Sequence, residues 1–243
     1  MRWIVGVVLL VVIAAAFRLP DLATRVMHTD EAVNAVIAND LHQRAKYRYD
    51  PVEHHGPTLP FLTLPVLAAS EVHSFDEMTE SQLRGVTALV GILLVLVLAL
   101  ARPLLGTGAT LATMLWLAVS PAAVYYSRYY IHEIVLVAFT TLALLAYGRA
   151  TLRPTAHTES PAPAWLGVVS PWWILTGVSL GAMHATKETF VIAVGAAGLA
   201  TIATAWWERR ASPLPPESRR RRWWAVVTAL LAAVIVSYAL FSF

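Results

Sequence analysis

Long apolar stretches constrain the fold of this chain more than any other feature. Seven of them have the roughly 17 to 25 residues with few charges that a helix needs to cross a bilayer, at 3–19, 85–101, 108–126, 131–148, 165–183, 189–207 and 223–243. The composition agrees, because 58% of the residues are hydrophobic and only 14% are charged. Backbone groups in lipid must be hydrogen-bonded within their own segment. The sequence therefore predicts an all-α, polytopic integral membrane protein with about seven transmembrane helices.

The positions of Lys and Arg predict the orientation, since positive residues in short loops favour the cytoplasmic side. If the N-terminus is cytoplasmic, the inside segments hold Arg2, Arg102, Arg149, Arg153, Arg209, Arg210 and residues 219–222, whereas the short outside loops hold only Arg128 and Lys187. Twelve of the fifteen acidic residues and seven of the eight histidines also fall outside. We therefore expect the polar chemistry of the chain on the extracytoplasmic face.

The first apolar stretch has two interpretations. Arg2, the apolar core and Ala14-Ala15-Ala16 fit a cleaved signal peptide as well as an uncleaved anchor. The number of spans that follow favours the anchor. Either way, Asp30 lies on the outer side.

Residues 18–84 form a long first extracytoplasmic loop, which we expect to contain juxtamembrane helices. Residues 30–46 have Val33, Val36, Ile37 and Leu41 on one helical stripe, which predicts an amphipathic helix at the membrane surface with Thr29 as its N-cap. Residues 58–70 are apolar but too short to span, so they suggest an interfacial or re-entrant helix. The spacing from Ser74 to Glu77 predicts a capping box before the second span.

Polar residues gather at the outer ends of the apolar stretches. They are Asp30 and Glu31; Asp50, Glu53, His54 and His55; Arg128, His132 and Glu133; and His184, Lys187 and Glu188. Because the outer connections bring these groups to one level above the lipid, we expect them to converge. Cations can hold an anionic leaving group while a carboxylate takes a proton from a nucleophile, so the mixture suits phosphate chemistry. The chain has no Cys, which excludes disulfides and thiolate metal sites.

Four segments, in this order, carry a resemblance to a known superfamily. They are Thr29-Asp30-Glu31, His55-Gly56-Pro57, Ser127-Arg128-Tyr129-Tyr130-Ile131-His132-Glu133 and Ala185-Thr186-Lys187-Glu188. Together they resemble the C-type membrane glycosyltransferases. Within that superfamily the chain is similar to protein O-mannosyltransferases and aminoarabinose-lipid A transferases, with the strongest likeness to the prokaryotic flippase-activity-associated branch. The resemblance covers most of the chain and depends on the order and topology of the motifs.

The resemblance implies an enzyme that passes a sugar from a polyprenyl-phosphate carrier to an acceptor on the outer face of a prokaryotic plasma membrane. Membrane lipids are its surroundings, and no nucleic acid is expected as a partner. The acceptor, whether protein, lipid or glycan, stays open. Relatives continue with more spans, so residues 1–243 are expected to be the N-terminal part of a transmembrane domain whose C-terminal part is missing.

The same resemblance assigns roles to residues. Asp30 would be the general base that activates the acceptor hydroxyl, Glu31 would orient it, and Glu133 stands where relatives carry a second acid, usually Asp. Arg128 and Lys187 would hold the carrier phosphate, and the substrate-binding set is completed by His55, His132, His184 and Glu188. Some relatives bind a divalent metal ion near the first-loop proline, for which the candidates here are His54, His55 and Glu133.

Other interpretations of these residues remain open. Asp30 and Glu31 could be first-turn acids stabilised by a helix dipole. His54 and His55 could be turn residues, and Arg128 and Lys187 could be interfacial side chains. A non-catalytic component of lipid-linked oligosaccharide export would share this topology. A secondary transporter fits less well, because the only ionisable residues in the apolar stretches are Arg18, His132 and Glu133, all near the outer ends.

Overall fold

The computed structural model describes residues 1–45, 47, 49–50, 55–151, 170–211, 235–236 and 238–239. All regular structure in these residues is helical, which confirms the predicted all-α class for this part of the chain. The helices are α1 (Arg2–Arg18), α2 (Thr29–Arg44), α3 (Thr58–Ala69), α4 (Glu80–Val97), α5 (Arg102–Val119), α6 (Pro121–Ser127), α7 (Glu133–Thr151), α8 (Pro171–His184) and α9 (Phe190–Ala211), with short 3₁₀ helices at Phe75–Glu77 and Leu98–Ala101.

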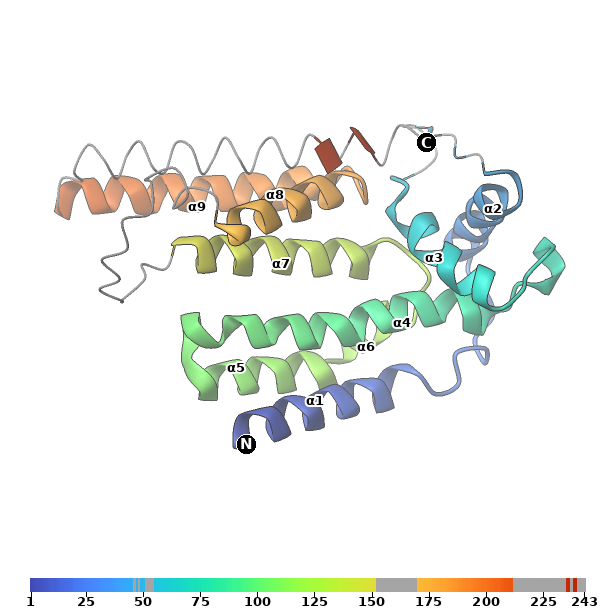
Figure 1. The fold of residues 1–243 in the computed structure, drawn as a ribbon, viewed down its shortest axis with the longest axis horizontal. Coiled ribbons are helices and arrows are strands. Elements are labelled where there is room, and N and C mark those ends of the chain that lie inside the picture. Colours follow the sequence, from blue (N-terminus) through green and yellow to red (C-terminus); the bar gives the residue numbers. More distant parts are fainter. Residues whose placement is uncertain are drawn as a thin grey trace.

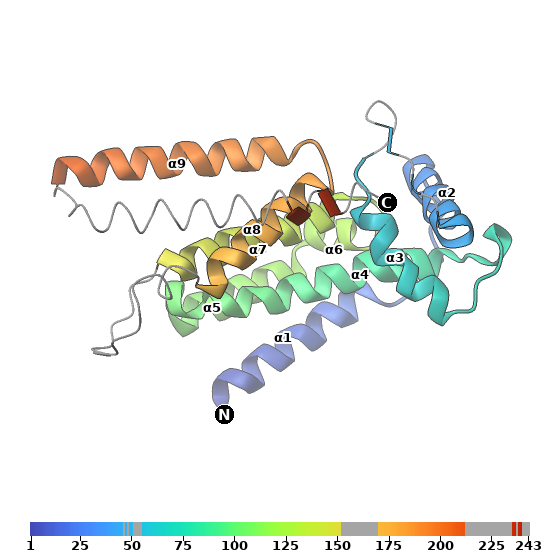
Figure 2. The same cartoon turned by 45° about the horizontal axis from the view of Figure 1, so that its top comes forward.

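The long helices form a layered bundle, with α2 and α3 at one end. In Figures 1 and 2, α7 lies between α4 and α8, while α1 and α9 lie on opposite sides. Successive long helices run in opposite directions, so α1 and α8 end, and α4 and α7 begin, at the end next to α2 and α3. We call this the α2–α3 end. The connections that the distribution of Lys and Arg predicts to be outside lie at this end. Helices α1 and α5, which begin at Arg2 and Arg102, start at the opposite end.

Two described segments are long and apolar enough to cross a membrane by length and composition, Glu80–Val119 and Glu133–Thr151. The first is two antiparallel helices, α4 and α5, because the chain reverses near Gly106, whose φ is 79° and ψ is 168°. Glycine adopts this positive φ readily because it has no Cβ. Helix α1 has 17 residues, and Thr58–Ala69 and Phe190–Thr204 are shorter apolar helices. The count of seven spans stays a prediction, since 165–169 and most of 223–243 lie outside the described residues.

The predicted span 108–126 is not one helix. Helix α5 ends at Val119, Ser120 has a non-helical ψ of 121°, and α6 starts at Pro121. Proline is well tolerated at the first position of a helix, where no intrahelical partner is lost. The break therefore produces two helices instead of one kinked span.

Arg18 binds the carbonyls at the end of α5. Its guanidinium is fully buried and donates to Ala118 O at 2.8 Å, to Leu117 O at 3.0 Å and to Ser127 Oγ at 3.1 Å. The last carbonyls of a helix carry partial negative charge and lack helical partners, so a buried cation is stabilised there. Gly91 of α4 packs against the same group, since a Cβ there would lie 2.1 Å from Ser127 Oγ. Arg18 thus joins α1 to α5 and α6.

Two predicted helix starts were wrong. The N-cap of α2 is His28 and not Thr29: the His28 Nδ1 accepts from Asp30 N–H at 3.2 Å, and Glu31 completes a capping box. The capping box before the second span is Thr79 with Gln82, whereas Ser74 makes no side-chain cap and precedes a 3₁₀ turn. Ser74 lies three positions before Glu77 and Thr79 lies three positions before Gln82, so spacing alone did not distinguish these two starts.

The predicted apolar stripe of α2 is only partly buried. Leu41 packs inward, but Val33 and Val36 are exposed, and the buried face is Glu31, Asn34, Ala35, Ala38 and Leu41. Ala35 belongs to a core cluster that also contains Leu59 of α3, Leu83 of α4 and Ile134 of α7. This core fixes the start of α2 against the segment 128–132.

Candidate active site at the α2–α3 end

Glu31 is a fully buried acid that five N–H groups surround. Arg84 donates to both its oxygens, at 2.8 and 2.9 Å, and Arg25 donates at 3.1 Å. The backbone N–H groups of Tyr130 and His28 donate at 2.9 and 3.0 Å. Burial raises the pKa of Glu31, but the hydrogen bonds and charge of its partners outweigh burial and lower the pKa overall. Glu31 therefore stays ionised and joins α2 to α4 and to the segment before α7.

Asp30 is exposed, whereas the adjacent Glu31 is buried. Its side chain is 67% exposed, and the Nδ1 of His28 lies 3.6 Å from the carboxylate. That nitrogen already accepts from Asp30 N–H, so it holds no proton for the carboxylate. Consecutive helical residues point about 100° apart, which is why one acid is buried and the other is open. Asp30 is thus the acid available to a substrate.

The connections after α8 and before α3 are hydrogen-bonded to each other. Gly56 N–H donates to Thr186 O at 3.2 Å, and Thr58 donates to Ala185 O through its N–H at 3.2 Å and its hydroxyl at 2.7 Å. A Cβ on Gly56 would lie 2.1 Å from Ala185 O, so only glycine permits this approach. These bonds bring His55 and Lys187 to the same cavity.

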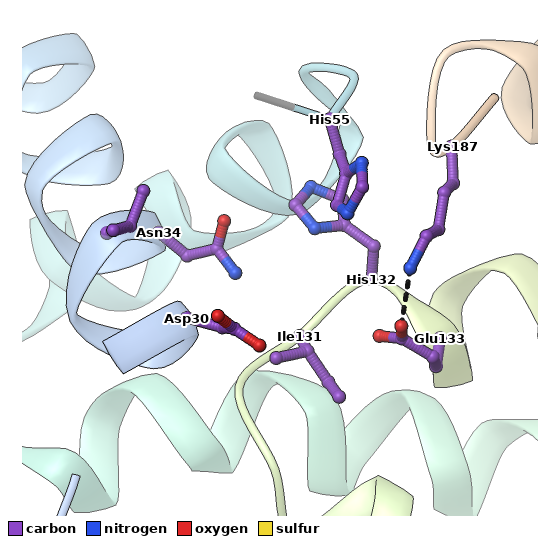
Figure 3. A pocket seen from close by; sticks show the side chains of 8 residues that line it. Asp30, Asn34, His55, Ile131, His132, Glu133 and Lys187 are labelled. Carbon is purple, nitrogen blue, oxygen red and sulfur yellow. Dashed lines mark hydrogen bonds and ion pairs between the residues drawn. The ribbon is translucent and has the colours of Figure 1, made fainter. Parts of the chain in front are cut away.

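A cavity of about 180 Å³ opens where α2 meets these connections. Its lining consists of Asp30, Val33, Asn34, His55, Ile131, His132, Glu133 and Lys187. Figure 3 shows Asp30 on one side and the Lys187–Glu133 pair on the other, with the histidines between them. Lys187 Nζ lies 2.5 Å from Glu133 Oε1. The cavity therefore combines a free carboxylate, a neutralised ion pair and two imidazoles.

His55 and His132 form one side of this cavity. Their ring centroids are 5.2 Å apart in an edge-to-face arrangement. His55 Nδ1 lies 3.1 Å from Glu188 Oε2, and this contact helps to lower the pKa of Glu188 against the opposing effect of burial. His132 is 2% exposed, and its Nε2 lies 3.1 Å from Gly56 O.

Several predicted site residues do not line the cavity. Arg128 donates to Phe17 O and Asp21 O, both at 3.2 Å, beside the end of α1. His184 is the last residue of α8, and its ring contacts Phe190. Glu188 is not in the lining, but it contacts His55, which is. The structure thus brings together Asp30, His55, His132, Glu133 and Lys187.

Of the three metal candidates, His55 and Glu133 lie in the part of the chain that the structure describes. No group of three or more His, Asp or Glu side chains there is placed to hold an ion. Glu133 is bound by a lysine ammonium, which repels a second cation, and His55 faces Glu188. His54 lies outside the described residues.

A second cavity, of about 320 Å³, adjoins the first at Glu133. It lies over α4, α5, α6 and α7, and is lined by Leu94, Leu117, Ala122, Ala123, Tyr126, Glu133, Ile134 and Val137. Apart from Glu133, these residues are apolar or aromatic. A polar cavity and an apolar one thus share a single acidic residue.

Three residues that the sequence analysis did not select complete the site. Arg84 and Arg25 bind Glu31, and the Asn34 amide donates to Tyr130 O at 3.2 Å while lining the cavity. One feature of the sequence could have identified Arg84 as a residue with a buried partner. A lone cation in the first turns of an apolar helix is stable only with a nearby carboxylate or with carbonyl partners.

Comparison with known proteins identifies the family. Residues 63–243 match the family model described as dolichyl-phosphate-mannose-protein mannosyltransferase. The chain belongs to this family. The predicted resemblance to protein O-mannosyltransferases and to C-type glycosyltransferases is therefore confirmed. No curated protein matches the sequence.

Solved structures show the same fold. The Saccharomyces cerevisiae Pmt1–Pmt2 O-mannosyltransferase complex bound to its sugar donor matches with a TM-score of 0.77 and 19% identity, over 100% of this chain and 33% of that chain. ArnT from Cupriavidus metallidurans bound to undecaprenyl phosphate matches with a TM-score of 0.69 and 20% identity, over 96% and 41%. The Archaeoglobus fulgidus oligosaccharyltransferase gives 0.58 and 18%, over 76% and 24%. This mannosyltransferase-family chain thus spans less than half the length of each.

Proposed function

We propose that this chain carries the catalytic base, Asp30, of a glycosyltransferase that moves a sugar from a polyprenyl-phosphate donor to an acceptor hydroxyl on the extracytoplasmic face. One observation carries the proposal: of two adjacent acids, Glu31 is fully engaged by five N–H groups and Asp30 is open to a cavity. The family match and the fold of the ArnT structure bound to undecaprenyl phosphate support it.

The two adjoining cavities suit a lipid-linked sugar. The apolar cavity over α4 to α7 would hold the first units of the polyprenyl chain, and the polar cavity would hold the sugar. The phosphate would then lie where the cavities meet, within reach of Lys187. Glu133 would keep the Lys187 ammonium in place until the phosphate arrives. Arg128 lies outside the polar cavity, so a role for it would require a phosphate position nearer the end of α1.

The reaction is a single displacement. Asp30 takes the proton of the acceptor hydroxyl, whose oxygen forms a bond to the anomeric carbon from the face opposite the phosphate. The bond between the anomeric carbon and the phosphate oxygen breaks, and its electron pair leaves with the polyprenyl phosphate. The anomeric configuration is inverted. Lys187 stabilises the negative charge that grows on the leaving oxygen.

Asp30→Asn tests the proposal, with Asp40→Asn as the matched control. Asp40 lies on the same helix, 46% exposed, and pairs with Arg44 at 3.7 Å, outside the cavity. With polyprenyl-phosphate mannose as donor and full-length protein, Asp30→Asn should lose at least about 100-fold in transfer rate, in line with general-base catalysis. Asp40→Asn should keep the wild-type rate. Retained transfer in Asp30→Asn would contradict the catalytic role, and donor binding by wild-type protein without turnover would favour the export component.

A further inference from the structure

The hydrogen bond of His132 fixes which of its nitrogens carries the proton. Its Nε2 lies 3.1 Å from Gly56 O, and a backbone carbonyl can only accept, so Nε2 must donate. His132 is 2% exposed, and burial disfavours the charged form of an imidazole, so the ring is neutral. A neutral ring with its proton on Nε2 has a bare lone pair on Nδ1.

This lone pair has no partner among the residues that the structure describes. The Nδ1 atom is buried without a hydrogen bond, while the His132 ring lines the polar cavity. In Figure 3 the ring extends from its backbone toward the side of the cavity where Asn34 and Asp30 lie. Buried polar atoms are nearly always paired with protein or with ordered water, so an orphaned acceptor at a cavity wall requires a donor from the cavity, either water or a ligand group that replaces it.

The other side chains that line the cavity restrict which kind of ligand could donate a hydrogen bond to His132. Asp30 and Glu133 offer carboxylate oxygens, one N–H of the Asn34 amide donates to Tyr130 O, and the Lys187 ammonium is paired with Glu133. A phosphate oxygen brings no proton and would face the Nδ1 lone pair unfavourably. A sugar hydroxyl can donate to Nδ1, and its other hydroxyls can donate to the carboxylates.

We infer that His132 Nδ1 accepts a hydrogen bond from one hydroxyl of the donor's sugar, which makes His132 a residue that determines sugar specificity and not a phosphate ligand. The inference rests on the proposed function. It implies that the donor must carry a hydroxyl at one ring position. A donor that lacks this hydroxyl would leave Nδ1 buried and unpaired.

The test compares two probes and two substitutions in full-length protein, by equilibrium binding without acceptor. The probes are polyprenyl-phosphate mannose and sugar-free polyprenyl phosphate. His132→Gln retains an N–H for Gly56 O but removes the acceptor at the Nδ1 position, whereas His132→Asn retains an acceptor near that position. His132→Gln should weaken binding of the mannose-bearing probe about tenfold and leave the sugar-free probe unchanged. His132→Asn should recover most of the lost affinity.

A second measurement varies the sugar of the probe and compares wild-type protein with His132→Gln. Among mono-deoxy analogues of the mannose-bearing probe, one should bind wild-type protein about tenfold more weakly and bind His132→Gln no worse than the parent donor. If all analogues lose affinity equally in both proteins, or if His132→Gln weakens both probes alike, the inference is wrong while the proposed function stands. If wild-type protein binds neither probe, the proposed function fails and the inference fails with it.

Discussion

Removing the Glu31 carboxylate should destabilise the chain far more than removing any exposed acid of the same helix. Glu31→Ala leaves the Arg84 guanidinium, which is 1% exposed, without its carboxylate partner, and it leaves the N–H groups of Tyr130 and His28 without acceptors. Breaking a buried ion pair by removing one member costs about 3 to 5 kcal/mol. Glu31→Ala should therefore lower the free energy of unfolding by about that amount.

The assay is reversible denaturant unfolding of purified full-length protein in detergent micelles, followed by tryptophan fluorescence. The control is Asp40→Ala, whose exposed pair with Arg44 should contribute less than about 1 kcal/mol. The double substitution Glu31→Leu with Arg84→Met should cost clearly less than the sum of the two single changes, because it leaves no buried charge unpaired. If Glu31→Ala costs no more than Asp40→Ala, or if the double change is additive, the buried pair does not hold this end of the bundle.

The same contact predicts a pH dependence. The pKa of Glu31 in the folded protein lies below its ordinary value of 4.5, so the unfolded chain binds the proton more readily. The stabilisation is therefore complete above about pH 5 and is lost as the pH falls below 4.5 through the folded pKa. Glu31→Gln, which cannot titrate, should lack this part of the acid destabilisation in the same unfolding assay.

Three further substitutions test the local geometry. Thr79→Ala should lower the free energy of unfolding by about 1 kcal/mol, because it removes the cap of α4, whereas Ser74→Ala should have no measurable effect in the same assay. Gly56→Ala should weaken donor binding and stability together, by about 1 to 3 kcal/mol in unfolding, since its Cβ would lie 2.1 Å from Ala185 O. A Gly56→Ala protein with wild-type stability would show that the connections before α3 and after α8 need not approach so closely.

Local chemistry predicted much of the architecture. Helix α3 lies within one residue of the predicted 58–70, and α7 and α9 start within two residues of the predicted stretches. These boundaries are set by where the apolar run gives way to polar or capping residues, which is local information. The break at Ser120 was missed because proline inside a helix and proline at a helix start look alike in one sequence.

The pairings of the site could not be predicted in the same way. Arg84 is 53 residues from Glu31, and Lys187 is 54 residues from Glu133. The orphaned Nδ1 of His132 exists only because Gly56, 76 residues away, accepts from the other ring nitrogen. Such contacts depend on how the helices pack against one another, and the packing cannot be predicted from hydropathy or residue spacing.

Asp30 and Glu31 show the division most clearly. The sequence by itself determined that two acids follow an apolar helix, that they begin a further helix, and that they accompany basic and histidine motifs typical of one transferase superfamily. The residues on either side of the two acids in the sequence do not indicate which of them is buried. Only the tertiary structure decided that Glu31 faces Arg84 in the interior and that Asp30 faces a cavity. The physical reason is the 100° turn between neighbouring helical residues, combined with a core that covers one side of α2 and leaves the other open.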